Sequence, residues 1–169
     1  MRVPRLPTDI VRDVAAVWRA DVEEAETVAG LLVAFRDWLG RDAPSAASFL
    51  SGVRRLIQDP SVEYLLGAVS AGEEAAGVCQ LRFRYGVWHA AEDCWLEDLF
   101  VREASRGAGL GAALTRRALD RARERGCARV ELDVNESNPA ALALYEGLGF
   151  SVESDPPGAR NLLMRWRAP

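Results

Sequence analysis

Three glycines within five residues, Gly107, Gly109 and Gly111, most constrain what this chain can fold into. They stand between a predicted strand at residues 94–101 and a strongly amphipathic helix predicted at residues 109–125. Glycines at such a junction let the backbone approach a ligand closely, and the helix start offers unpaired N–H groups to an anion. Since one glycine costs about 1 kcal/mol of helix stability relative to alanine, capping alone does not explain three. The junction therefore predicts a site for a phosphorylated ligand.

Hydrophobic periodicity and turn residues predict the other elements. Helices are expected at residues 22–39, 45–58, 109–125 and 138–149. Strands are expected at residues 17–20, 64–69, 76–85, 94–101, 128–134, 150–153 and 161–166. The strands at 64–69 and 76–85 are expected to form an antiparallel hairpin.

The length of 169 residues and the 49% of hydrophobic residues suit one domain with a proper core. No linker, internal repeat or low-complexity tract divides the chain. We therefore expect a single domain over residues 16–169, preceded by an extension at residues 1–15 whose structure the sequence does not define.

Composition excludes several classes of function. The chain has no lysine, so neither a Walker A phosphate loop nor a Schiff-base enzyme can be built from it. A single histidine, His89, and three cysteines without a C-x-x-C pair indicate no metal site. The net charge of −4 argues against a nucleic-acid partner. No signal peptide or membrane span is indicated, so a reduced, cytoplasmic protein is expected.

The glycine junction also fits the dinucleotide fingerprint G-x-G-x-x-G/A, with Gly107, Gly109 and Ala112 at its fixed positions. Two features oppose this interpretation. Residues 102–106 separate the strand from the first glycine, whereas the dinucleotide turn follows its strand directly. The segment before the junction also indicates an antiparallel hairpin, although a dinucleotide fold needs a mostly parallel sheet.

A later segment has no counterpart in the dinucleotide pattern, and it runs Asn138-x-x-Ala141-x-x-x-Tyr145-Glu146-x-x-Gly149-Phe150. The junction itself, Arg106-Gly107-Ala108-Gly109-Leu110-Gly111, fits the signature Q/R-x-x-G-x-G/A. With the strand Leu96-Glu97-Asp98-Leu99-Phe100-Val101 before them, these motifs resemble the GNAT superfamily of acetyl-CoA-dependent N-acetyltransferases. The specific resemblance covers roughly residues 95–150. It implies an α/β fold with a mixed, mostly antiparallel central sheet of six to seven strands, flanked by about four helices.

The resemblance implies acetyl-CoA as the donor cosubstrate, with no metal. The cofactor pyrophosphate would bind the junction, whose residues are Arg106, Gly107, Ala108, Gly109, Leu110, Gly111 and Ala112. Backbone groups of Leu99, Phe100 and Val101 would face the pantetheine arm and the acetyl carbonyl, while their side chains pack in the core. Asn138 would contact the cofactor arm, although a helix N-cap before Pro139 explains the same residue.

The resemblance also implies two catalytic residues. Tyr145 would protonate the departing thiolate, although its helical position also suits a core tyrosine. An attacking amine must lose a proton, and Glu97 is predicted to take it through a water molecule. A solvated or salt-bridged Glu97 is nearly as well supported, and Asp98, Glu131 and Asp133 are weaker candidates for the base.

The predicted reaction is direct acetyl transfer to a primary amine of a small cationic molecule, such as a polyamine, an aminoglycoside or an amino-acid-like amine. Residues 102–129 carry eight arginines against three acidic residues, a local balance of +5, whereas the remainder carries −9. The basic segment suits coenzyme A phosphates and the acidic remainder suits amines. Two alternatives stay open: acetylation of a protein N-terminus or lysine, and a non-catalytic acyl-CoA-binding module. The oligomeric state is also open, with a homodimer as one option.

Overall fold

The computed structural model describes residues 15–152, 158 and 163–166. The chain divides into two compact units, one ending at Asp133 and the other beginning at Val134. The expected extension at residues 1–15 lies outside the described residues except for Ala15. Much of the expected last pair of strands lies outside them too.

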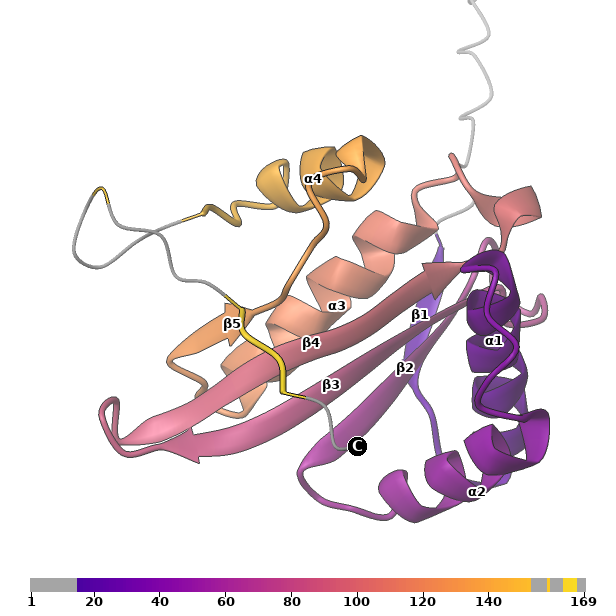
Figure 1. The fold of residues 1–169 in the computed structure, drawn as a ribbon, viewed down its shortest axis with the longest axis horizontal. Helices are drawn as coiled ribbons and strands as arrows, with labels where there is room; N and C mark the ends of the chain where they lie inside the picture. The colour runs from indigo at the N-terminus through magenta and orange to yellow at the C-terminus, as the bar shows by residue number, and fades with distance from the viewer. Residues whose placement is uncertain (1–14, 153–157, 159–162, 167–169) are drawn as a thin grey trace, which may run out of the picture. The chain divides into compact units, whose positions relative to one another are not determined.

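The first unit is built on a five-stranded sheet whose strands lie side by side in sequence order (Figure 1). The strands are β1 (Ala16–Arg19), β2 (Val62–Ala68), β3 (Gly77–Gly86), β4 (Ala91–Val101) and β5 (Arg129–Glu131). All neighbours pair antiparallel except β4 and β5, which are parallel. The prediction of a mixed, mostly antiparallel sheet is therefore confirmed. A dinucleotide fold would need a mostly parallel sheet, so the rival interpretation of the glycine junction does not fit.

The strand count differs from the expected six to seven, because the described residues contain five strands. Residues 150–152 and 163–166 form no strand, while 153 and 161–162 lie outside the described part. β5 is also shorter than the seven residues expected, since only Asp93–Trp95 of β4 pair with it. Alternating apolar residues describe an extended chain, but a strand also needs a hydrogen-bonded neighbour.

Four helices are present in the described residues, as expected. They are α1 (Ala25–Trp38), α2 (Ala46–Leu56), α3 (Leu110–Glu124) and α4 (Pro139–Glu146), the last in the second unit. A 3₁₀ turn over Val22–Glu24 precedes α1, and Asp21 and Glu24 cap it reciprocally. The helix predicted at residues 138–149 ends three residues early, at Glu146. None of the described helices has the length and apolar character that crossing a membrane requires.

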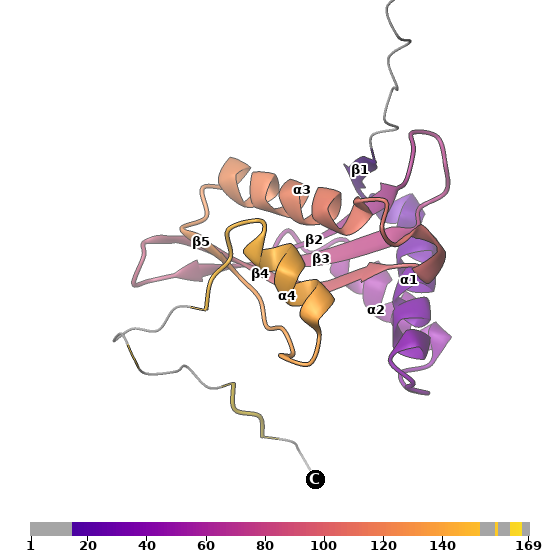
Figure 2. The same cartoon turned by 90° about the horizontal axis from the view of Figure 1, so that it is seen from above.

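Helices cover both faces of the sheet, with α1 and α2 on one face and α3 on the other (Figures 1 and 2). β2 is buried along its whole length because its side chains alternate between the two cores. Tyr64 and Leu66 pack with α1 and α2, whereas Leu65 packs with α3. The sheet therefore carries a separate apolar core on each face.

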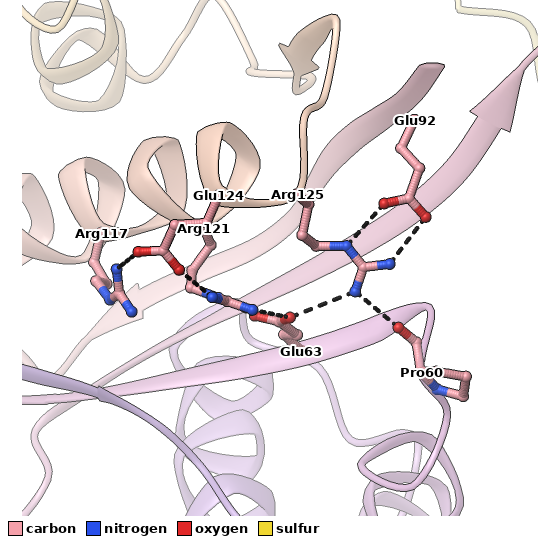
Figure 3. Close-up of polar contacts among 7 residues, drawn as sticks. All are labelled: Pro60, Glu63, Glu92, Arg117, Arg121, Glu124 and Arg125. Atoms are coloured by element: carbon pink, nitrogen blue, oxygen red, sulfur yellow. Dashed lines mark hydrogen bonds and ion pairs between the residues drawn. The ribbon is translucent and has the colours of Figure 1, made fainter. Parts of the chain in front are cut away.

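One charged residue of β2, Glu63, lies beneath the C-terminal half of α3 (Figure 3). Its carboxylate accepts hydrogen bonds from Nε and Nη2 of Arg121, both at 2.7 Å, and only 1% of the Glu63 side chain is exposed. Arg125 lies 3.5 Å from Glu63 and donates two hydrogen bonds to Glu92 on β4. Glu124 joins Arg117 and Arg121 at the solvent side. This network fixes α3 to β2 and β4.

The protonation of Glu63 is governed by two opposing effects. Burial raises the pKa of its carboxyl, but the hydrogen bonds and charge of Arg121, with the charges of Arg19 and Arg125, hold the net pKa below its ordinary value of 4.5. A lowered folded-state pKa means that the ionised form stabilises the fold. This stabilisation is present above the unfolded-state pKa and is lost as pH falls through the folded-state pKa.

We predict that Glu63→Gln lowers the free energy of unfolding by about 3 kcal/mol at pH 7, because it breaks a buried ion pair. The variant should also lose stability less steeply than the parent protein as pH falls below about 4.5. Urea denaturation at several pH values measures both effects. Glu26→Gln is the matched control, since Glu26 pairs with Arg54 at the surface, where such a pair contributes about 0.5 kcal/mol. Equal losses in the two variants would contradict the structural role of Glu63.

Candidate functional site

The glycine junction leads into α3 through a backbone conformation that glycine favours. Gly107 and Gly109 have φ values of +81° and +83°, in the left-handed region that side chains disfavour. Gly109 is the N-cap of α3, and no side chain among the described residues caps this helix start. The first N–H groups of the helix therefore have no capping side chain from the described part of the chain, and they lie at the positive end of the helix dipole. This geometry suits an anion such as a phosphate.

Two facing glycines place this helix start against the sheet. Gly67 of β2 pairs with Gly77 of β3, and Leu110 and Leu114 of α3 fill the space that their missing side chains leave. A Cβ atom at Gly67 would lie 2.8 Å from Cδ1 of Leu110, and one at Gly77 would lie 2.8 Å from Cδ1 of Leu114. The pair of glycines therefore sets how closely α3 approaches β2 and β3.

Arg106 holds the junction at its start. Its Nε donates a 3.0 Å hydrogen bond to the carbonyl of Val101, at the end of β4. Its guanidinium lies over the ring of Trp38, 4.6 Å from the centroid, at the end of α1. The sequence placed Arg106 among the cofactor-binding residues. In the structure the Arg106 side chain instead contacts the protein itself, and its hydrogen bond uses the carbonyl of Val101.

β4 has an unpartnered stretch next to the junction. β5 pairs only with Asp93–Trp95, so no strand of the described chain lies beside residues 96–101 on that edge. Phe100 is buried in the core with α1 and α2, and Leu99 and Val101 pack against the core with α3. This confirms that their side chains are core. Backbone N–H and C=O groups along such an edge can pair with an extended ligand.

Of the two neighbouring carboxylates of β4, one lies in a β-bulge and the other in the regular register. Gln80 pairs with Asp98 and Leu81 pairs with Leu96, so Glu97 is the extra residue between these pairs. The Glu97 carboxylate accepts a 2.5 Å hydrogen bond from Nε2 of Gln80. It also forms an ion pair with Arg82, whose Nε donates to the same oxygen. Glu97 is thus a salt-bridged carboxylate, which was the alternative to its role as base.

Asp98 is partly buried and differs from Glu97 in its surroundings. Burial, together with the negative charges of Glu97 and Asp133, raises the pKa of Asp98 to about 6, against the opposing effect of Arg82. A carboxyl with this pKa is ionised at pH 7 and still accepts a proton near neutrality. The sequence analysis ranked Asp98 below Glu97 because the bulge depends on the pairing of β3 with β4, which the sequence does not show.

Three residues around these carboxylates were missed by the sequence analysis. Gln80 and Arg82 are polar residues on a strand whose neighbours are apolar, and this was the available signal. Tyr64 is cross-strand to Gln80, and burial raises the pKa of its hydroxyl to about 12. These three residues bind or surround Glu97 and Asp98. The resulting cluster of polar side chains spans the adjacent strands β2, β3 and β4.

Asn138 and Tyr145 belong to the second unit and are described within it. The side-chain oxygen of Asn138 accepts a 3.1 Å hydrogen bond from the N–H of Ala141, so Asn138 caps α4. The ring of Tyr145 meets the ring of Phe150 edge-on, with the centroids 5.6 Å apart. Among the described residues, no group of three or more potential metal ligands lies together.

Comparisons with known proteins agree with this geometry. Residues 19–150 match the Acetyltransferase (GNAT) family. The thialysine N-epsilon-acetyltransferase of Bos taurus is 31% identical over 95 residues, which are 53% of this chain and 55% of that protein. A mycothiol acetyltransferase of Beutenbergia cavernae is 55% identical over 68 residues, or 38% of this chain and 23% of that protein. The chain thus spans about half or less of these relatives.

A solved structure extends the similarity over almost the whole chain. The crystal structure of an Arthrobacter sp. FB24 protein described as an acetyltransferase is 27% identical, with a TM-score of 0.80. The match covers 98% of this chain and 100% of that one.

We predict that Gly77→Ala lowers the free energy of unfolding by about 1–3 kcal/mol, because the added methyl group overpacks the contact with α3. One neighbour of this methyl group would be the carbonyl oxygen of Phe100, at 3.2 Å, which cannot rotate away. Urea denaturation measures the change. Gly52→Ala in α2 is the control, since no atom lies within 4 Å of its added Cβ, and it should gain about 0.5–1 kcal/mol. A stabilised Gly77→Ala variant would show that α3 is not held by this contact.

Proposed function

The chain belongs to the GNAT acetyltransferase family, and we propose on that premise that it transfers acetyl from acetyl-CoA directly to a primary amine of a small cationic molecule. The observation that carries this proposal is the start of α3 at Gly109, which no side chain of the described residues caps, next to the stretch of β4 with which no described strand pairs. The family match runs from residue 19 to 150, through both compact units. This supports the proposal of one acetyltransferase domain over residues 16–169.

The donor is proposed to bind in two parts. The pyrophosphate of acetyl-CoA lies on the backbone N–H groups of residues 107–112, where the left-handed glycines keep side chains away. The pantetheine arm follows the free edge of β4 at Leu99, Phe100 and Val101. An N–H group of this edge polarises the thioester carbonyl as the oxyanion develops. Arg106 contributes by fixing the end of β4 to the junction.

The acceptor is proposed to be cationic because the side chains of Glu97 and Asp98 bring negative charge to the same strand. The name of the Bos taurus relative states an ε-amine of thialysine as the acetylated group, which supports an amino-acid-like amine. One carboxylate of this pair takes the ammonium proton, since an alkylammonium of pKa near 10.4 is not nucleophilic. The neutral amine then forms the N–C bond.

The remaining proton goes to the leaving group. As the tetrahedral intermediate collapses, the C–S bond breaks, and Tyr145 is proposed to protonate the thiolate of coenzyme A. Asn138 is proposed to contact the cofactor arm in addition to capping α4. Both roles rest on the family resemblance, and each is testable with one variant.

We predict that a panel of amines shows thiol release from acetyl-CoA with small cationic acceptors such as thialysine, lysine or a polyamine. Negative charge on β4 favours these acceptors over neutral or acidic amines. Release only with a peptide that bears a free N-terminal amine would favour a protein acetyltransferase. Acetyl-CoA binding, seen as a raised Tm, without turnover on any amine would contradict the proposed enzyme and favour a binding module.

We predict that Tyr145→Phe lowers kcat about 100-fold, the lower end of what general-acid catalysis contributes. The phenylalanine ring retains the edge-on contact with Phe150, so the fold should be kept. Steady-state kinetics with acetyl-CoA varied separates the effect on kcat from that on KM. Tyr85→Phe is the control, because Tyr85 is an exposed tyrosine on β3. An unchanged kcat and pH profile would remove Tyr145 as the acid.

A further inference from the structure

The bulge in β4 gives the two neighbouring carboxylates different roles. Glu97 is the extra residue of the bulge, and Asp98 returns to the cross-strand register opposite Gln80. Two donors of β3, Gln80 and Arg82, converge on a single oxygen of Glu97. A carboxylate with two donors on one oxygen, one of them a guanidinium, is held in one position.

Asp98 lacks such partners. Among the described residues, no hydrogen bond or ion pair reaches its carboxylate, and its side chain is partly buried. The titratable and charged groups around it come from its own strand, from β2 and β3, and from the segment that follows β5, and they are Glu97, Arg82, Asp133, Tyr64 and Cys79. Two of these are carboxylates and one is a guanidinium. The fixed charge of Glu97 therefore disfavours a second negative charge on Asp98.

We propose that Arg82 is a positioning residue that, with Gln80, fixes the Glu97 carboxylate in the bulge and thereby leaves Asp98 as the base that takes the proton of the acceptor amine. This inference rests on the proposed function and assigns the roles within the carboxylate pair. Glu97, held in its ion pair with Arg82, raises the proton affinity of Asp98.

The acceptor ammonium gives one proton to the carboxylate of Asp98, directly or through one water molecule, and becomes a neutral amine. The amine lone pair forms the N–C bond to the acetyl carbon. As the tetrahedral intermediate collapses, the C–S bond breaks, Tyr145 protonates the departing thiolate, and the nitrogen loses its second proton, which restores the Tyr145 phenol, leaving an amide and coenzyme A. Protonated Asp98 then loses its proton to solvent. A pKa of about 6 suits this cycle, because the group is ionised before the step and gives up its proton readily at pH 7.

The test compares the pH dependence of kcat in four variants with saturating acceptor. Asp98→Asn should lose about 100-fold or more in kcat, together with the acid limb near pH 6. Glu97→Gln should move the acid limb to lower pH, because a negative charge near Asp98 is removed. Arg82→Gln should move it to higher pH, because a positive charge is removed. Arg84→Gln on the same strand is the control, since Arg84 pairs with Glu131 and should leave the limb in place.

Carboxyl NMR titration of the protein provides a second readout without turnover. Asp98 should titrate near pH 6 in the parent protein and shift in the same opposite directions in Glu97→Gln and Arg82→Gln. A fully active Asp98→Asn variant, or loss of the acid limb in Glu97→Gln alone, would overturn the assignment and leave the acetyltransferase intact. Titration of Asp98 near its ordinary value would overturn it as well. Absence of turnover with every amine would instead overturn the proposed function, and the catalytic role of Asp98 with it.

Discussion

The approach of α3 to the paired glycines of β2 and β3 is the contact on which the rest of the first unit depends. Leu110 and Leu114 occupy the space at Gly67 and Gly77, so the start of the helix is fixed over the sheet. At its other end the helix is tied through Arg121 to the buried carboxylate of Glu63. An apolar contact and a charged one thus fix both ends of α3. The free N–H groups of its first turn therefore have a defined position and direction.

This placement connects the donor and acceptor sides of the proposed site through β4. The strand ends at Val101, whose carbonyl is held by Arg106 at the start of the glycine junction. The bulge at Glu97 lies a few residues earlier on the same strand. A bulge reverses the alternation of side chains, so Asp98 and Leu99 point to faces that a regular strand would have exchanged. In the proposed mechanism, one strand thereby binds the cofactor through its backbone and the amine through its side chains.

Much of the fold followed from the chain itself. Helix α3 was predicted within one residue at each end, because its apolar positions repeat at helical spacing between Gly109 and Gly126. The β2–β3 hairpin and the cap of α4 at Asn138 were also predicted from local patterns. The expected strands at residues 150–153 and 161–166 were not found in their described parts. Alternation alone does not show whether an extended segment has a neighbour to pair with.

The sequence by itself determined the family, the helix start that suits a phosphate, and the two carboxylates of β4, because short motifs and periodicity record local backbone requirements. Only the tertiary structure decided how these carboxylates differ. The register of β3 against β4 brings Gln80 and Arg82 onto Glu97 and leaves Asp98 without such partners. Charge and burial act through space between strands that are distant in the chain, so no local pattern could record which carboxylate has its pKa raised.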